Sequence, residues 1–230
     1  MRISIMQPGY LPWLGFFELI EQCDQFVILD DVQYTKRDWR SRNRIRTKNG
    51  WIWLTVPVLS KDKEEQLIKD VRINNDISWK KDHLNSIKIN YSKSKFFKNY
   101  FKYFENIYNK SWEYLIDLNM DIIYFLTKEI NISTPIVLSS SLSISALSKN
   151  QRIIEICKKL KADELYDSKA AESFIDIELF KKEGIKVLFQ DYKHPEYSQS
   201  YKPFIGQMSV IDLLFNEGAN SKNIILKGSA

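Results

Sequence analysis

Residues 2–31 read RISIMQPGYLPWLGFFELIEQCDQFVILDD, and this stretch decides the fold class. The apolar run Arg2 to Met6 stops at Gln7-Pro8-Gly9, a cluster of strand-breaking residues, so it predicts a strand. From Pro12 to about Cys23 apolar residues recur at helical spacing, and Gln25 to Leu29 is apolar again. A strand, loop, helix and strand of this length begin a parallel α/β unit.

Polar residues follow both predicted strands. Gln7 comes after the first and Asp30-Asp31 after the second. Ligands of parallel sheets bind outside the carboxyl ends of the strands, so we expect these side chains at one functional edge. Asp30 and Asp31 are assigned to catalysis: they could orient a base, bind the substrate amine or hold a metal, although no residue is assigned as a metal ligand. The alternative is that they only cap the next turn.

Asn49-Gly50 lies between two extended runs and predicts a β-hairpin over about residues 42–58 with a type I′ turn. The expected pairs are Lys48 with Trp51, Thr47 with Ile52, Arg46 with Trp53, Ile45 with Leu54, and Arg44 with Thr55. The face toward the core would carry Ile45, Thr47, Ile52, Leu54 and Val56. The other face would carry Arg44, Arg46, Lys48, Trp51 and Trp53, and arginine beside tryptophan favours stacking on a planar or charged ligand.

The positive charge of the chain is concentrated around this hairpin. The formal net charge is +5, and residues 36–48 alone contribute +6, which leaves 27 basic and 28 acidic residues elsewhere. A local excess favours a discrete anion site over a uniformly basic surface. Two alternatives stay open: a solvated strand face that binds nothing, and a surface that tracks a nucleic-acid backbone.

The rest of the chain completes an α/β pattern in a single domain over residues 1–230. We expect a mainly parallel sheet flanked by helices, with a helical insertion at about 76–131, where aromatic and apolar residues repeat at helical spacing. Further strands are predicted at 67–73, 135–138, 162–166 and 185–190, and further helices at about 150–160, 175–182 and 210–215.

Several classes of protein are disfavoured. The chain has neither a signal-peptide pattern nor an apolar run of about eighteen residues, so a soluble, cytoplasmic protein without membrane insertion is expected. Cys23 and Cys157 lack metal-ligand spacing and are expected to be buried, reduced thiols. The common phosphate, dinucleotide, hydrolase and zinc motifs are absent.

The segments Met6–Gly15, Asp30–Gln33, Arg42–Ile45, Leu54–Val58 and Met208–Asn216, with Trp39 and His194–Tyr197, resemble the WbqC-like family. The resemblance spans nearly the whole chain. It implies a bacterial protein of O-antigen or other surface-polysaccharide synthesis. It further implies attachment of glycine or another acyl unit to a nucleotide-linked amino sugar. Relatives usually carry glycine after the strand at Leu165-Tyr166, where this chain reads Asp167 to Glu172.

His194 is the best candidate for a general base, because imidazole titrates near neutral pH and an attacking amine must lose a proton. The equally weighted alternative is a loop histidine held by hydrogen bonds. His83, in the lysine-rich helical region, is assigned to the surface. Pro8, Gly9 and Pro12 are expected to shape the first loop. The residues assigned to substrate binding are Gln7, Tyr10, Trp13, Lys36, Arg42, Asn43, Arg44, Arg46, Trp53 and Tyr197.

The resulting hypothesis is an acyl or aminoacyl transferase that modifies the amine of a nucleotide-linked amino sugar. The acyl donor is open among a thioester, an aminoacyl-tRNA and a free amino acid with ATP. Apart from a tRNA donor, no nucleic-acid partner is expected on this hypothesis. The alternatives are a non-catalytic nucleotide-sugar-binding or scaffold protein of the same pathway and a nucleic-acid-binding protein.

Overall fold

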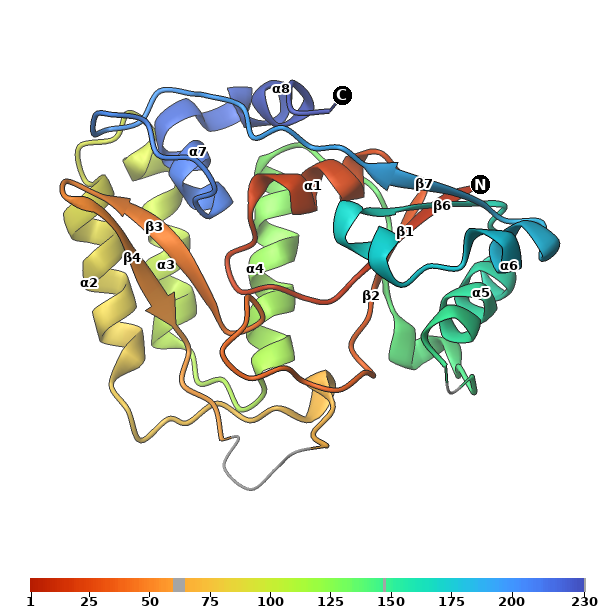
Figure 1. Cartoon of the computed structure of the whole chain (residues 1–230). Coiled ribbons are helices and arrows are strands. Elements are labelled where there is room, and N and C mark those ends of the chain that lie inside the picture. The colour runs from red at the N-terminus through yellow and green to blue at the C-terminus, as the bar shows by residue number, and fades with distance from the viewer. Residues whose placement is uncertain (60–64, 147, 230) are drawn as a thin grey trace.

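The main sheet has five parallel strands in the order β5-β2-β1-β6-β7 (Figure 1). The structure is a computed structural model, and it describes residues 1–59, 65–146 and 148–229. This sheet confirms the predicted α/β class. Its strands are β1 (Arg2–Met6), β2 (Gln25–Ile28), β5 (Ile136–Leu138), β6 (Glu164–Ser168) and β7 (Lys186–Gln190).

Helices cover both faces of the sheet. On one face, Ile3, Ile5, Val27 and Leu165 pack against α5 and α6, whose buried contacts include Ile156 and Phe180. On the other face, Phe26 and Ile28 join a larger core with α1 and α4. The helices are α1 (Leu14–Glu21), α2 (Trp79–Tyr91), α3 (Phe97–Asn109), α4 (Leu115–Glu129), α5 (Lys149–Lys159), α6 (Ile177–Lys182), α7 (Val210–Glu217) and α8 (Ser221–Leu226).

The strand order reverses between β1 and β6. The chain places β2 and then β5 on one side of β1, and afterwards places β6 and β7 on the other side. Two loops that diverge from such a switch point leave a crevice, and doubly wound folds bind ligands there. Gln7 leaves β1 at this edge of the sheet, so the fold puts the first signature loop at a position suited to a site.

The predicted hairpin is present as β3 (Arg42–Thr47) and β4 (Gly50–Thr55), but its expected register is wrong. The observed pairs include Arg44 with Trp53, Ile45 with Ile52, and Thr47 with Gly50, so Lys48-Asn49 form the loop. Of the turn residues 48–50, only Gly50 has a positive φ, of 127°, so the turn is not type I′.

The register differs by two residues from the expected one, and the same side chains therefore share each face. The reason for the shift is the Arg46 side chain, which donates from Nη1 to the carbonyl oxygens of Thr47 and Gly50 and fixes those two residues opposite each other. Two placements on the faces are wrong: Ile52 is 38% exposed, and Arg46 is buried.

The structure corrects one further predicted strand, adds a helix and confirms the prediction for the cysteines. The predicted strand at 67–73 is instead a short 3₁₀ helix, Ile68–Asp70, flanked by single bridges from Leu67 to Gln33 and from Ile73 to Val58. Ile68, Val71 and Ile73 are buried, but the two ends of the segment pair with different parts of the chain, so no continuous strand forms. Helix α8 was not expected. Both cysteines are free and buried, which confirms that prediction.

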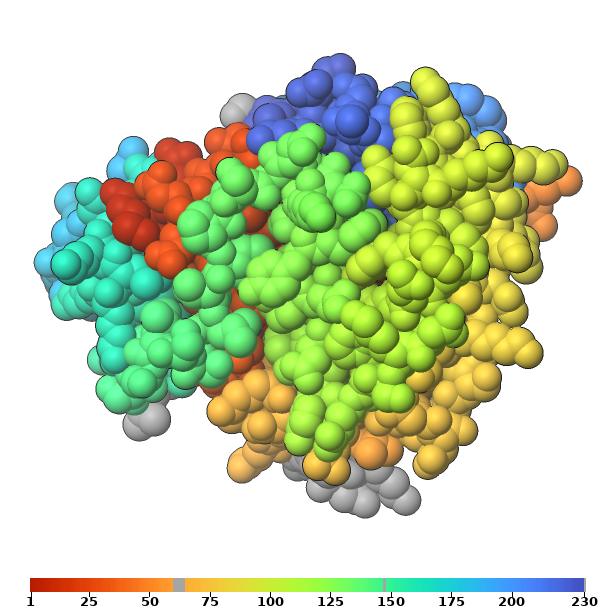
Figure 2. Space-filling model, turned by 180° about the vertical axis from the view of Figure 1, so that it is seen from behind, coloured from red at the N-terminus to blue at the C-terminus, as the bar shows by residue number. Residues whose placement is uncertain are grey.

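The predicted helical insertion comprises α2, α3 and α4, with hairpin β3-β4 packed beside α2 (Figure 1). Figure 2 shows the opposite side, where α3 and α4, in yellow-green and green, cover the molecule beneath the blue C-terminal helices. Within the described parts of the chain, no helix has the length and apolar character required to cross a membrane.

Candidate functional site

The loop from Gln7 to Trp13 connects the sheet to the hairpin. Tyr10 N donates to the Trp39 carbonyl oxygen at 3.0 Å, and Asn43 Nδ2 donates to the Leu11 carbonyl oxygen at 2.7 Å. Leu11 has a φ of 47°, which a leucine adopts only when its surroundings fix it. The loop is therefore a rigid support for the residues around Trp39 and Asn43.

Tyr10 itself lies in the core. Its hydroxyl contacts His83 Nδ1 at 2.8 Å and the Tyr108 hydroxyl at 2.5 Å, and the tyrosine has no exposed surface. The prediction that His83 is a surface residue is wrong: it is 5% exposed and packs against Trp79. Its imidazole can be buried because Tyr10 provides a hydrogen-bond partner. Tyr10 thus reaches away from any ligand on the outer surface.

Arginines and tryptophans gather on the outer face of the hairpin. The Arg42 guanidinium lies 4.4 Å from the centre of the Trp53 ring, and the Arg44 guanidinium lies 5.0 Å from Trp51 and 5.7 Å from Trp39. Trp39, Trp51 and Trp53 are 48%, 41% and 37% exposed. We call these five residues, Trp39, Arg42, Arg44, Trp51 and Trp53, the Arg/Trp face.

The Arg/Trp face carries uncompensated positive charge. In the described chain, neither Arg42 nor Arg44 forms an ion pair with a carboxylate, whereas the nearby Arg40 pairs with Asp38. Stacking on a ring holds a guanidinium in place and leaves its N–H groups free for an anion. Burial lowers the pKa of Arg44 from its ordinary value, but an arginine remains charged at neutral pH.

Arg46 and Asn43 have structural roles in this region. Arg46 is 1% exposed and donates to the Pro203 carbonyl oxygen at 2.7 Å and to Gln199 Oε1 at 3.3 Å, besides its bonds across the turn. Asn43 is 2% exposed and holds the first loop. Tyr197 is also buried and donates from its hydroxyl to Asp212 Oδ2 at 2.8 Å. Lys36 is exposed.

Trp13 packs over the start of α1. A Cβ atom on Gly15 would lie 2.2 Å from the Trp13 ring, so the absence of a side chain at residue 15 lets the indole lie there. The Tyr192 ring meets Trp13 edge-on at 5.4 Å. Trp13 also bridges to Ser209, whose backbone N–H donates to the Arg44 carbonyl oxygen. Trp13 is therefore near the backbone of the Arg/Trp face.

His194 lies on the 192–208 segment, in the electrostatic neighbourhood of Arg44. Burial lowers the pKa of His194, a hydrogen bond with the Pro195 carbonyl oxygen at 3.1 Å opposes this shift, and the Arg44 charge lowers it further. The imidazole is thus neutral at pH 7. When Nδ1 carries the proton for Pro195, Nε2 has a free lone pair. Nε2 is buried and has no hydrogen-bond partner.

Asp30 and Asp31 form a separate cluster at the carboxyl end of β2. Asp30 Oδ1 accepts from Ser140 N at 2.9 Å and from Ser139 Oγ at 3.1 Å, while Asp31 pairs with Arg152 Nη1 at 2.8 Å. None of the contacts found among the described residues joins either aspartate to His194 or to the Arg/Trp face. Gln7, at the end of the neighbouring strand, has a buried Oε1 without a partner. The aspartates and the Arg/Trp face are therefore two separate clusters, and the first loop contacts the hairpin side through Trp39 and Asn43.

Some residues at these clusters had no signal in the sequence. Ser139 and Ser140 directly follow β5, and Arg152 lies in α5, more than a hundred residues after Asp30. Gln207 belongs to no recognised sequence motif, yet its main-chain oxygen and its side-chain Oε1 both accept hydrogen bonds from Arg44. Only pairing of distant strands and loops brings these groups together.

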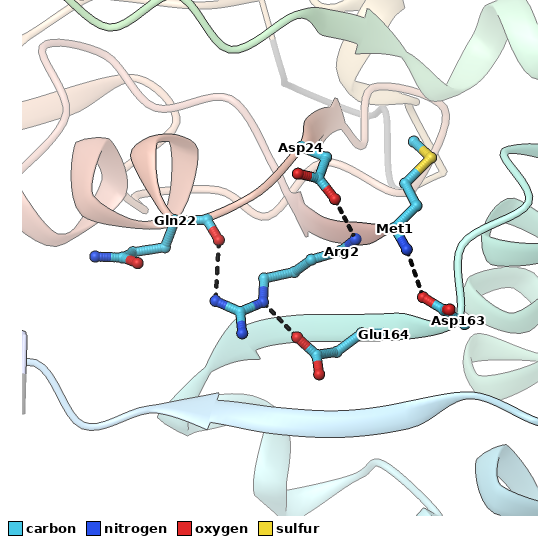
Figure 3. Close-up of a pocket in the computed structure, with 6 residues that line it drawn as sticks. All are labelled: Met1, Arg2, Gln22, Asp24, Asp163 and Glu164. Carbon is cyan, nitrogen blue, oxygen red and sulfur yellow. Dashed lines mark hydrogen bonds and ion pairs between the residues drawn. The ribbon is translucent and has the colours of Figure 1, made fainter.

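No group of three or more histidine, cysteine, aspartate or glutamate side chains suited to a metal ion occurs among the described residues. An open pocket does occur at the opposite, amino end of the sheet (Figure 3). Its polar groups pair with one another: Met1 N with Asp163 Oδ1 at 2.6 Å, and Arg2 N with Asp24 Oδ2 at 2.7 Å. We interpret it as the anchor of the N-terminus, because the terminal ammonium group pairs with Asp163 and the Arg2 guanidinium pairs with Glu164.

The comparisons with known proteins identify one family and one relative. The model of the WbqC-like protein family matches residues 7–224. An uncharacterized protein of Mycobacterium tuberculosis, Rv1507c, is 34% identical over 226 residues, which cover 97% of this chain and 97% of the relative. No solved structure matches this chain.

Proposed function

Since this chain belongs to the WbqC-like protein family, we propose that it transfers an acyl or aminoacyl group to the amine of a nucleotide-linked amino sugar. The reaction would serve bacterial surface-polysaccharide (O-antigen) synthesis in the cytoplasm. The observation that carries the proposal is the Arg/Trp face, with two arginines stacked on tryptophans and unpaired with any carboxylate in the described chain.

The chemistry of the ligand fits this face. A nucleotide-linked sugar carries two negative charges on its pyrophosphate and an aromatic base. Guanidinium groups bind phosphate oxygens through charge-assisted hydrogen bonds. The exposed ring of Trp51 or Trp53 offers the base a stacking surface. The pyrophosphate can therefore bind the arginines of the Arg/Trp face, and the base can stack on its tryptophans.

The transfer step needs a base. The sugar nitrogen attacks the acyl carbonyl carbon, the new C–N bond forms as the bond to the donor's leaving group breaks, and a base accepts the proton of the nitrogen. His194 supports this role because its imidazole is neutral and Arg44 is near. Asp30 and Asp31 are tied to Ser139, Ser140 and Arg152, which disfavours proton transfer by either carboxylate.

A second candidate function is a non-catalytic protein that binds the nucleotide-linked sugar and presents it to another enzyme. The observation that favours it is the burial of His194 Nε2, which keeps the free lone pair away from solvent in this conformation. Under this alternative the Arg/Trp face keeps its ligand, and His194 only holds its loop.

Incubation with a dTDP-linked amino sugar and candidate donors, analysed by mass spectrometry, distinguishes the two. Thioester, aminoacyl-tRNA, and glycine with ATP are tested separately. A mass gain on the sugar that is lost with His194→Ala supports the transferase. Binding without any mass gain, unaffected by His194→Ala, supports the presenting protein. If single-stranded RNA raises the Tm and no nucleotide-linked sugar does, both are wrong and the face binds nucleic acid.

A further inference from the structure

Gln207 accepts the hydrogen bonds of one nitrogen of the Arg44 guanidinium. Arg44 Nη2 donates to the Gln207 carbonyl oxygen and to the Gln207 side-chain Oε1, each at 3.1 Å. Both acceptors are neutral, and no carboxylate in the described chain forms an ion pair with Arg44. Arg44 is thus bound by two neutral oxygens of Gln207, at a position where an arginine usually pairs with a charged group.

The same edge of Arg44 has a second, unused donor. Nε is buried and has no hydrogen-bond partner. Nε and Nη2 point their N–H groups in parallel along one edge of a guanidinium, the arrangement that binds two oxygens of a phosphate or carboxylate at once. Buried polar groups without partners are uncommon in proteins, so the orphan Nε points to a missing oxygen ligand.

We propose that Gln207 Oε1 holds the place of an oxyanion on Arg44 and is displaced when a phosphate group of the ligand binds along the Nε and Nη2 edge. This inference rests on the proposed function, since it assigns the pyrophosphate of the nucleotide-linked sugar to that edge. Gln207 then acts as a specificity-determining residue, because a ligand must compete with it for Arg44.

The chain around Gln207 permits this displacement. On one side, Gln199 binds residue 205 through two hydrogen bonds, from Gln199 Nε2 to the Ile205 carbonyl oxygen and from Ile205 N to Gln199 Oε1, both at 2.9 Å. On the other side, Ser209 N donates to the Arg44 carbonyl oxygen at 2.9 Å. The side chain of Gln207 is exposed between these anchors, so it can rotate into solvent while its backbone oxygen stays on Nη2.

The charge of a ligand determines whether it can displace Gln207 from Arg44. A phosphate adds the Coulomb attraction between two full charges to the hydrogen bonds along the guanidinium edge, which the neutral amide of Gln207 does not offer, so a phosphate oxygen displaces that amide. A hydroxyl group of a sugar without phosphate is a neutral acceptor and gains nothing over Gln207. The face would therefore reject neutral sugars and accept phosphorylated ones.

Isothermal titration with inorganic pyrophosphate tests the inference on the whole protein and three variants. Gln207→Ala removes the competing oxygen and should tighten binding roughly 3- to 10-fold, whereas Gln207→Glu places a carboxylate on Arg44 and should weaken it by at least tenfold. Gln151→Glu, which adds the same charge at an exposed position on α5, is the matched control and should bind as the parent does.

Arg44→Ala separates this inference from the proposed function. If the parent protein binds pyrophosphate and Arg44→Ala does not, the anion site is present. An unchanged or weaker affinity of Gln207→Ala then shows that Gln207 only supports Arg44, which overturns the inference alone. If the parent and Arg44→Ala bind equally, or neither binds, the anion site itself is wrong and the proposed function loses its support. Circular dichroism confirms that each variant is folded.

Discussion

The Asn43 side chain donates a hydrogen bond to the Leu11 carbonyl oxygen at 2.7 Å, and it thereby joins the hairpin to the loop that follows β1. Asn43 is 2% exposed, and its own Oδ1 accepts from Arg44 N at 2.8 Å. One side chain thus fixes both the backbone of the first loop and that of an arginine on the Arg/Trp face.

Replacement of this asparagine should destabilise the protein. Asn43→Ala leaves the buried Leu11 carbonyl oxygen without its donor, and we expect the free energy of unfolding to fall by about 1–3 kcal/mol. Urea denaturation measures this change. Asn49→Ala, in the exposed turn of the same hairpin, is the control and should change stability by less than about 0.5 kcal/mol. Equal stability of the two variants would contradict the role given to Asn43.

Tyr10→Phe tests whether Tyr10 belongs to the core or to the ligand site. The change removes the hydroxyl shared by His83 and Tyr108, so we expect a loss of about 1–3 kcal/mol in the free energy of unfolding. Ligand affinity of the folded variant should stay at the parent value. A variant with parent stability and no binding would show instead that Tyr10 contacts the ligand.

His83 gives stability a defined dependence on pH. Burial lowers the pKa of His83 from 6.5 to about 4, so between these values the unfolded chain takes up a proton that the folded protein does not. The free energy of unfolding therefore falls as the pH drops from 6.5 to 4, by roughly 3 kcal/mol from this group, and the loss is complete below pH 4.

Urea denaturation of the parent and of His83→Gln across this range isolates the effect. Asp167 acts in the opposite direction, because burial raises its pKa from 3.8 to about 6, so its contribution to stability falls as the pH rises through that range. Asp167 is present in both proteins and cancels in the comparison. The curves should converge toward low pH. Curves that run parallel from pH 6.5 to 4 would rule out a neutral, buried His83.

Trp53→Ala should affect a nucleotide but not pyrophosphate. Stacking of a base on an exposed aromatic ring is worth about 1–3 kcal/mol, so we expect a five- to hundredfold weaker affinity for a dTDP-linked sugar, as measured by titration. Tyr124→Ala removes an aromatic side chain of similar exposure from α4 and serves as the control. An equal loss for pyrophosphate would mean that Trp53 acts by holding Arg42.

Much of the fold follows from local patterns. The segment 2–31 predicts β1, α1 and β2, because apolar residues with strand and helix periods and Pro-Gly breaks specify them without distant contacts. The hairpin faces are also predictable, since side chains alternate along a strand. Its register is not, because the Arg46 bonds to Thr47 and Gly50 that fix it do not appear in a turn motif.

The site was less predictable than the fold. The alternation of residues along the two hairpin strands predicts that arginines and tryptophans share one face, as they do in the Arg/Trp face. The burial of Tyr10 and His83 depends on Tyr108, which is ninety-eight residues from Tyr10, and no local sequence pattern predicts that contact. Arg44 and Arg46 are alternate residues of β3 and would be expected on the same face of the strand. The 199–205 segment nevertheless covers only Arg46. Sequence spacing places residues on a face, but tertiary packing decides which of them reach solvent.

The most direct test of the central claim is the affinity of a dTDP-linked amino sugar for the parent protein and for Arg42→Gln/Arg44→Gln, measured by isothermal titration. Each lost charge-assisted hydrogen bond costs about 1.5–3 kcal/mol, so the double variant should bind at least about a hundredfold more weakly. Lys98→Gln, at an exposed position of α3, removes charge elsewhere and should bind as the parent does. Equal affinities of the parent and the double variant would contradict the assignment of the ligand to the Arg/Trp face.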